Sequence, residues 1–198
     1  MYAEHTDDLP TMSVAEYLAF ADDKDSKYEY KAGGVYAMAG ASVRHNTIVA
    51  STVMHLGNLL NDRDCTVNAS DTRVKIKGAT AFRYPDVTVF CDDPAYWEQR
   101  VDTITNPVIL VEVLSPGTAV SDYNEKLEEY VQLKSLQVYI IIAQDKPKIE
   151  VYWRDDAGKW TYEIATGLEA TLEVPALDRI LHLTLAQIYR RVRWEDDK

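Results

Sequence analysis

Residues 107–114 read Pro107-Val108-Ile109-Leu110-Val111-Glu112-Val113-Leu114, an apolar run interrupted by a single carboxylate. A continuous apolar run of this length is typical of a strand that is covered on both faces of a sheet. A buried carboxylate costs on the order of several kcal/mol unless it is hydrogen-bonded, paired with a cation or bound to a metal. Glu112 is therefore a candidate functional residue at the centre of the fold.

A second acid stands in another apolar strand, predicted over residues 84–90, where Pro85-Asp86 precede the apolar positions. Side chains alternate along a strand, so residues 84, 86, 88 and 90 share one face, as do 108, 110, 112 and 114. If these strands are neighbours, Asp86 and Glu112 can reach one cation, and Mg²⁺ binds a few carboxylates and several waters. In the structural alternative, Pro-Asp simply marks a strand entry.

A helix is predicted from Asp122 to about Lys134, and Lys126 lies in its first turns, at the flank of its apolar face. From that position an ammonium group can be directed at the edge of a cleft. In the structural alternative, Asp122 is the N-cap with Glu125 at the third helical position, and Lys126 forms an exposed i,i+4 ion pair with Asp122. For Lys126 alone the exposed pair is favoured; together with the two acids, a functional role is favoured.

The other predicted elements place these three residues in one domain. Helices are predicted over 11–21, where Ser13 and Glu16 form a capping box, over 42–60 and over 184–192. A hairpin with a Gly33-Gly34 turn is predicted from strands 27–32 and 35–38. Further strands are expected over 71–77, 138–143, 148–154 and 159–164, with an edge piece near 171–174.

The central order is therefore helix, three strands (71–77, 84–90 and 107–114), helix, strand. This order predicts a mixed α/β sheet with helices on its faces, extended by the N-terminal hairpin and a C-terminal β-hairpin. We expect one domain over residues 11–193, a flexible N-terminus over 1–10 and a short tail over 194–198.

Two further residues are candidates for a site. His45 lies on the apolar face of the long helix, where a core histidine is the common case and a contact to a phosphate or to a site residue is the alternative. Glu29 lies in the first hairpin strand. The alternating Arg73, Lys75 and Lys77 favour a solvated strand face over a phosphate-binding stripe.

Composition limits the function classes. The net charge of −11 over 198 residues argues against tight non-specific binding to nucleic acid, which depends on Lys and Arg, but it does not exclude a metal-dependent enzyme. The sequence shows no secretory signal and no apolar run long enough to span a bilayer. Cys65 and Cys91 favour reduced thiols in a cytoplasmic protein, with a single disulfide as the alternative. Phosphate-loop, HExxH, nucleophile-elbow and dinucleotide motifs are absent from the sequence.

As a set, the motifs resemble the bacterial Uma-type family of predicted endonucleases within the PD-(D/E)XK restriction-endonuclease-like superfamily. The resemblance covers residues 11 to 193 and rests on Glu29, residues 35–42 with His45, Ser70-Asp71, Tyr84-Pro85-Asp86-Val87, residues 111–116 with Thr118, and Asp122 with Lys126 and Tyr130. It implies the superfamily's core of helix, three strands, helix and strand. It also implies Mg²⁺ or Mn²⁺ held by Asp86 and Glu112.

The sequence departs from the superfamily pattern at two positions. The lysine that normally stands two residues after the acid is replaced by Leu114, and Lys126 resembles the migrated lysine of variants of this fold. Gly34 stands where relatives often carry a glutamate.

The resulting hypothesis is a metal-dependent phosphodiesterase acting on DNA, with Asp86, Glu112 and Lys126 as catalytic residues. Tyr130 and Asp122 are expected to support them, and a homodimer is expected. Two alternatives stay open: a non-catalytic interaction protein that retains the fold, favoured by the acidic charge and by Leu114, and a hydrolase of a small phosphorylated compound.

Overall fold

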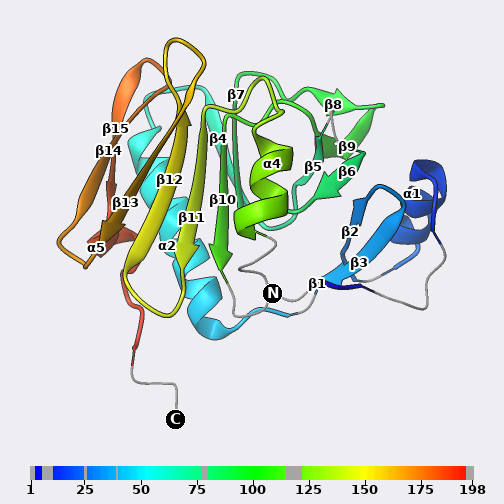
Figure 1. The fold of residues 1–198 in the computed structure, drawn as a ribbon, viewed down its shortest axis with the longest axis horizontal. Helices are drawn as coiled ribbons and strands as arrows, with labels where there is room; N and C mark the ends of the chain where they lie inside the picture. The colour runs from blue at the N-terminus through cyan, green and yellow to red at the C-terminus, as the bar shows by residue number, and fades with distance from the viewer. Residues whose placement is uncertain are drawn as a thin grey trace.

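The computed structural model describes residues 3–5, 11–24, 26–38, 40–76, 80–114 and 122–194. These residues form a six-stranded sheet, a seven-stranded sheet and a two-stranded hairpin, with helices packed around them (Figure 1). Each of the two larger sheets contains a parallel strand pair among antiparallel ones. The predicted mixed α/β class is confirmed.

The six-stranded sheet carries the long apolar run. Its strand order is β13 (Trp160–Thr166), β12 (Lys148–Arg154), β11 (Val138–Ala143), β10 (Ile109–Leu114), β7 (Val87–Cys91) and β4 (Cys65–Ala69). Strands β10 and β11 are parallel, so the chain must cross back between them, and η1 (Asp122–Lys126) and α4 (Leu127–Tyr130) lie in this connection. Strand β7 lies directly beside β10, as the sequence predicts.

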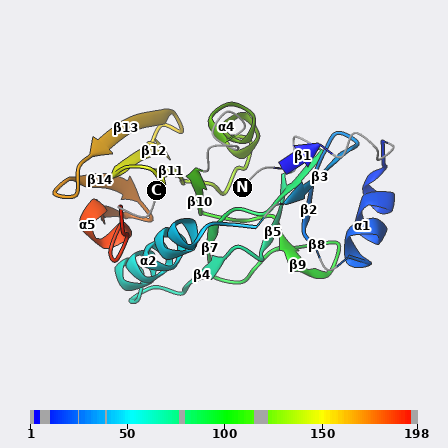
Figure 2. The same ribbon diagram turned by 90° about the horizontal axis from the view of Figure 1, so that it is seen from below.

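Helices cover both faces of this sheet. Figure 2 shows α2 (Val43–Leu59) and α5 (Leu185–Ile188) side by side on one face, and α4 on the other. The hairpin of β14 (Thr171–Ala176) and β15 (Arg179–Thr184) also packs on the α2 side. No helix of the described residues combines the length and the apolar character that crossing a bilayer requires.

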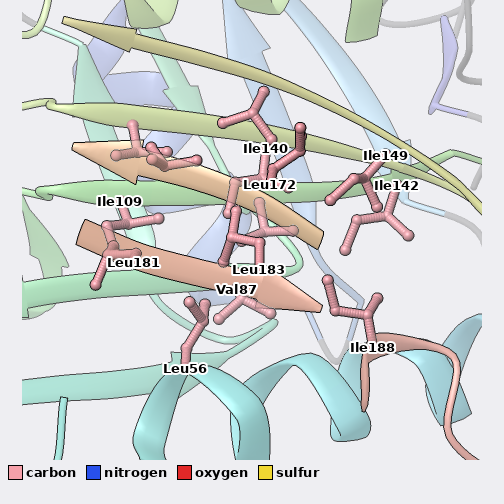
Figure 3. Close-up of a cluster of buried hydrophobic side chains, with 14 of the residues drawn as sticks. Leu56, Val87, Ile109, Ile140, Ile142, Ile149, Leu172, Leu181, Leu183 and Ile188 are labelled. Atoms are coloured by element: carbon pink, nitrogen blue, oxygen red, sulfur yellow. The ribbon is translucent and has the colours of Figure 1, made fainter. Parts of the chain in front are cut away.

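The main core lies between the six-stranded sheet, α2 and the C-terminal hairpin. The close-up in Figure 3 shows aliphatic side chains from all of these elements meeting in one layer. Since β10 is covered on both faces, all six of its residues are buried. Its odd-numbered residues belong to this core, whereas Leu110 and Leu114 belong to a second core beneath α4. By this alternation Glu112 faces α4.

The seven-stranded sheet forms the N-terminal side of the molecule. Its order is β1 (Ala3–His5), β3 (Gly34–Met38), β2 (Tyr28–Lys31), β6 (Ala81–Arg83), β5 (Arg73–Ile76), β9 (Arg100–Ile104) and β8 (Tyr96–Trp97). Helix α1 (Val14–Asp22) packs on it through Tyr17, and the predicted Ser13–Glu16 capping box is confirmed. Residues 3–5 of the predicted flexible N-terminus form β1, and the other residues of 1–10 lie outside the described ones.

Several predicted boundaries need correction. The strand predicted over 71–77 is β5 of the seven-stranded sheet, and the first of the three central strands is instead β4, which was not predicted. The hairpin turn is Ala32-Gly33, both with positive φ of 46° and 98°, because Gly34 already pairs with Lys31 in the ladder. Strand β15 was not predicted, and α5 is shorter than the expected helix over 184–192.

The prediction of reduced cysteines is wrong. Cys65 and Cys91 stand directly opposite each other on β4 and β7 and form a disulfide, with their Cα atoms 3.9 Å apart. The reason is the strand register: β4, missed in the sequence, brings together two residues separated by 26 positions.

Candidate active site

The candidate site lies at the seam between the two large sheets. The short segment Tyr84-Pro85-Asp86 connects β6 of one sheet to β7 of the other. Asp86, immediately before β7, is 7% exposed, and its Oδ2 accepts a hydrogen bond of 2.8 Å from the Val113 amide of β10. Proline at the preceding position favours the extended backbone that carries the chain from one sheet to the next.

His45 contacts the same carboxylate from α2. The Ser42 side chain caps this helix by accepting a hydrogen bond of 3.0 Å from the His45 amide, which places His45 in the first turn. Its Nε2 lies 3.2 Å from Asp86 Oδ2, and the residue is 3% exposed. The buried Nδ1 has no hydrogen-bond partner among the described residues. His45 is thus attached to Asp86 and does not pack as an ordinary core histidine.

Glu112 lies beside Asp86 on the neighbouring strand. The last paired residues of the antiparallel ladder are Val111 and Val87, so Glu112 and Asp86 are the next residue on each strand. Glu112 is 3% exposed, and its Oε1 accepts hydrogen bonds from Lys126 Nζ at 3.0 Å and from the Tyr130 hydroxyl at 2.8 Å. The two acids are therefore linked through consecutive residues of β10, because Asp86 binds the amide of Val113.

The structural alternative in which Lys126 is exposed to solvent is wrong. Lys126 is 7% exposed, and its Nζ contacts Glu112 and lies 3.7 Å from Glu29 Oε1. It occupies the π-helical turn η1, whose wider winding differs from the regular helix predicted over 122–134. The side chain of Asp122 lies outside the described residues, so its predicted supporting role stays a prediction.

A buried ion network continues from Lys126 into the seven-stranded sheet. Glu29 of β2 accepts hydrogen bonds from the Tyr84 amide at 3.1 Å and from Arg83 Nη1 at 2.8 Å. Arg83 also binds Glu129 of α4 through two hydrogen bonds of 2.8 Å. Arg83 and Glu129 were not singled out in the sequence. Their only signal was proximity, since Arg83 comes three residues before Asp86 and Glu129 three after Lys126.

The electrostatics of this network favour a charged Glu29, a charged Arg83 and a protonated Tyr130. Burial alone would raise the pKa of Glu29, but the charges of Lys126 and Arg83 outweigh it and hold the pKa below its usual value. Burial would lower the pKa of Arg83, whereas Glu29 and Glu129 raise it well above the usual range. Burial and the Glu112 charge both raise the pKa of Tyr130, which therefore remains a hydrogen-bond donor at neutral pH.

The structure thus brings six of the predicted site residues into one contiguous set of contacts: Asp86, His45, Glu112, Lys126, Tyr130 and Glu29. Two carboxylates on adjacent strands, with a lysine hydrogen-bonded to one of them, supply oxygen donors for a hard cation and an ammonium group beside it. A cluster of three or more His, Cys, Asp or Glu side chains with metal-binding geometry is not found among the described residues.

The prediction that Arg73, Lys75 and Lys77 form a solvated strand face is wrong for Arg73. Arg73 is 4% exposed, and its Nε donates a 2.7 Å hydrogen bond to the Tyr84 hydroxyl. Lys75 lies 4.9 Å from the centre of the Phe82 ring, and Lys77 lies outside the described residues. Arg73 thereby packs against the segment that carries Asp86 and contributes to the seam between the sheets.

Known proteins resemble this chain in fold and in sequence. A crystal structure from Anabaena variabilis ATCC 29413, described as a "putative nuclease belonging to DUF820", superimposes with a TM-score of 0.72. It is 18% identical and covers 90% of this chain and 97% of its own, a likeness that concerns the fold.

Two proteins of Synechocystis sp. (strain ATCC 27184 / PCC 6803 / Kazusa) are similar in sequence. The protein slr1290 is 32% identical over 164 residues, which are 81% of this chain and 85% of slr1290. The protein sll1609 is 30% identical over 162 residues, which are 82% of this chain and 92% of sll1609. Residues 14–186 match the Uma2 family, described as "Putative restriction endonuclease". The predicted resemblance is confirmed, and the chain belongs to the Uma2 family.

Proposed function

We propose that this protein is a metal-dependent phosphodiesterase of the restriction-endonuclease-like type that cleaves DNA. The observation that carries the proposal is the pairing of Asp86 and Glu112 on adjacent strands, with Lys126 held 3.0 Å from Glu112. The family's description as an endonuclease supports it. So does the chain order of α2, β4, β7, β10, α4 and β11, which is the superfamily core that the resemblance implies.

The donor set suits Mg²⁺ or Mn²⁺. Asp86 Oδ2 is occupied by the Val113 amide and by His45, while Oδ1 accepts no hydrogen bond from a described residue. Asp86 and Glu112 would hold the cation, with waters completing its shell, because Mg²⁺ takes one or two carboxylates and retains waters. The bound cation would supply charge neutralisation at the phosphate and a more acidic water.

The protein's own residues would then position the reacting groups. Lys126 donates a hydrogen bond toward the carboxylates and would hold the attacking water beside Glu112 in the same way. Tyr130 orients Glu112, and His45 orients Asp86, so neither acid rotates away from the site. Arg83 keeps Glu29 ionised, and Glu29 in turn lies next to Lys126 and favours its ammonium form.

The experiment that tests the proposal compares Asp86→Asn with the exposed Asp156→Asn. The amide retains an oxygen acceptor for Val113, so the fold should be preserved while the negative charge is lost. Titration calorimetry with Mn²⁺, and cleavage of supercoiled, linear and single-stranded DNA in Mn²⁺, are measured for both variants. We expect Asp86→Asn to lose metal binding and to reduce cleavage by roughly 10²-fold or more, whereas Asp156→Asn matches the wild type.

The non-catalytic alternative is favoured by one observation: Lys126 and Tyr130 already satisfy Glu112 Oε1 without a cation. Absence of Mn²⁺ binding and of cleavage in the wild type, across all DNA substrates and RNA, would support that alternative and contradict the nuclease proposal. Cleavage that survives in Asp86→Asn would show that the chemistry takes place elsewhere in the protein.

A further inference from the structure

A groove of about 520 Å³ runs along the outer face of α2, the face turned away from the sheet. It lies between this helix and the segment that follows α5, two elements that Figures 1 and 2 show side by side. Polar residues that line it include Asn46, Ser51, Asn58, Gln187, Arg190 and Arg191. The groove is separate from the candidate active site, whose residues do not line it.

The charge of the groove is opposite to that of the whole molecule. The chain carries a net charge of −11, yet none of the described residues lining the groove is acidic and two are arginines. Arg190 and Arg191 are both exposed, and neither forms an ion pair with a described residue. A cationic groove in an acidic protein is electrostatically complementary to an anion.

The arginines are held at the groove by the backbone that carries them. The Tyr189 hydroxyl, just before them, donates a 2.7 Å hydrogen bond to the Ala143 carbonyl of β11. Ser51 Oγ of α2 donates a 3.1 Å hydrogen bond to the Arg190 carbonyl. The backbone is therefore fixed against both the sheet and the helix, while the guanidinium groups remain exposed to solvent.

One end of the groove lies on the same turn of α2 as a residue of the candidate active site. Asn46 lines the groove in the turn of α2 that also carries His45, and His45 points inward to Asp86. The 17 residues of α2 span roughly 25 Å at 1.5 Å per residue, the length of about seven nucleotides along one strand of a duplex. Arginine, asparagine and glutamine are side chains that commonly donate to phosphate oxygens.

We propose that this groove binds the phosphodiester backbone of a nucleic acid next to the site of cleavage. The inference rests on the proposed function for the identity of the anion, and it adds a contact surface outside the metal site. The polymer would follow α2 toward its N-terminal end, where His45 and Asp86 lie on the inner side of the same helix.

The test is the salt dependence of DNA binding by Arg190→Gln/Arg191→Gln, with Lys134→Gln/Lys159→Gln as the matched control. Both control lysines are exposed and lie outside the groove. Binding of a fluorescent duplex of about 25 base pairs is measured by anisotropy in EDTA, so that cleavage plays no part. Thermal melting checks that each variant is folded.

We expect the arginine variant to bind at least tenfold more weakly. The slope of log K against log salt should become shallower by about 2, the value for two lost phosphate contacts. The control should keep the wild-type slope. An unchanged slope in the arginine variant would overturn the proposal. A wild type that binds neither DNA nor RNA would also overturn it. So would light scattering that finds a dimer for the wild type and a monomer for the arginine variant, because the groove would then be a dimer interface.

The outcomes separate this inference from the proposed function. A wild type that cleaves DNA and an arginine variant that binds it normally would leave the nuclease proposal intact and refute the groove. Conversely, the arginine variant could show the reduced slope of log K against log salt while neither the wild type nor any variant cleaves DNA. That result would support the groove and count against catalysis.

Discussion

Replacing Lys126 with methionine should destabilise the metal-free protein. In the structure its ammonium is buried, 3.0 Å from Glu112 and 3.7 Å from Glu29, so the substitution leaves two buried carboxylates without this cation. Removing one partner of a buried ion pair costs about 3–5 kcal/mol. Tyr130 still donates to Glu112 and Arg83 still binds Glu29, which places the expected loss near the lower limit, about 3 kcal/mol.

Urea unfolding at pH 7 in EDTA measures this loss. With a slope of about 2 kcal/mol per molar urea, the midpoint should fall by roughly 1.5 M. Lys134→Met, at an exposed position, is the control and should change the free energy of unfolding by no more than about 0.5 kcal/mol. Adding Glu112→Gln to Lys126→Met should restore part of the loss, because it removes one uncompensated charge.

An unaltered midpoint in Lys126→Met would refute the reasoning, since a buried charged pair cannot be broken without cost. It would mean that Lys126 is solvated in solution and that its contacts to the two acids are not formed. A loss that the Glu112→Gln substitution deepens would also contradict the electrostatic explanation.

Three further predictions concern the fold and its pH dependence. Gly33→Ala should cost more stability than Gly158→Ala, because both residues have positive φ but only at Gly33 would a Cβ collide with a neighbouring threonine side chain. Equal urea midpoints for the two variants would contradict this prediction. The pKa of Glu29 is lowered in the folded protein, so its contribution is complete above the unfolded value of about 4.3 and is lost as pH falls through the folded value. The stability deficit of Glu29→Gln should therefore be largest at neutral pH and shrink in acid; a deficit that is constant with pH would argue against it. Leu56→Ala should lose about 2–5 kcal/mol because this fully buried side chain fills the core, whereas Met54→Ala, 53% exposed on the same helix, should be nearly neutral in thermal unfolding.

The sequence predicted the parts of the fold that follow from strong periodicity. The apolar runs of β10 and β11 are continuous, and α2 has both a cap and an apolar face, so these elements were located within one or two residues. Strand β4 was missed because its alternating run, Cys65 to Ala69, is only five residues long and contains a threonine and an asparagine. Its place in the sheet comes from pairing with β7, a long-range contact that local propensity does not contain.

The sequence predicted the residues of the candidate site better than it predicted the ion network that supports them. A carboxylate in an apolar strand demands a partner, which identified Glu112 and directed attention to Lys126. Arg83 and Glu129 gave no comparable signal, because charged residues in a short strand and in a helix are ordinary when exposed. Only the packing of α4 against the two sheets shows that both are buried.

The position of the site at the seam has a consequence for how the protein can be divided. Asp86 and Glu112 belong to the six-stranded sheet, yet Glu29, which lies beside Lys126, arrives on β2 of the other sheet. A shortened protein that begins after residue 40 would retain both acids but leave Arg83 with only one of its two buried carboxylate partners, Glu129. The N-terminal hairpin is thus part of the candidate site, and a smaller engineered version would need a new acid in place of Glu29.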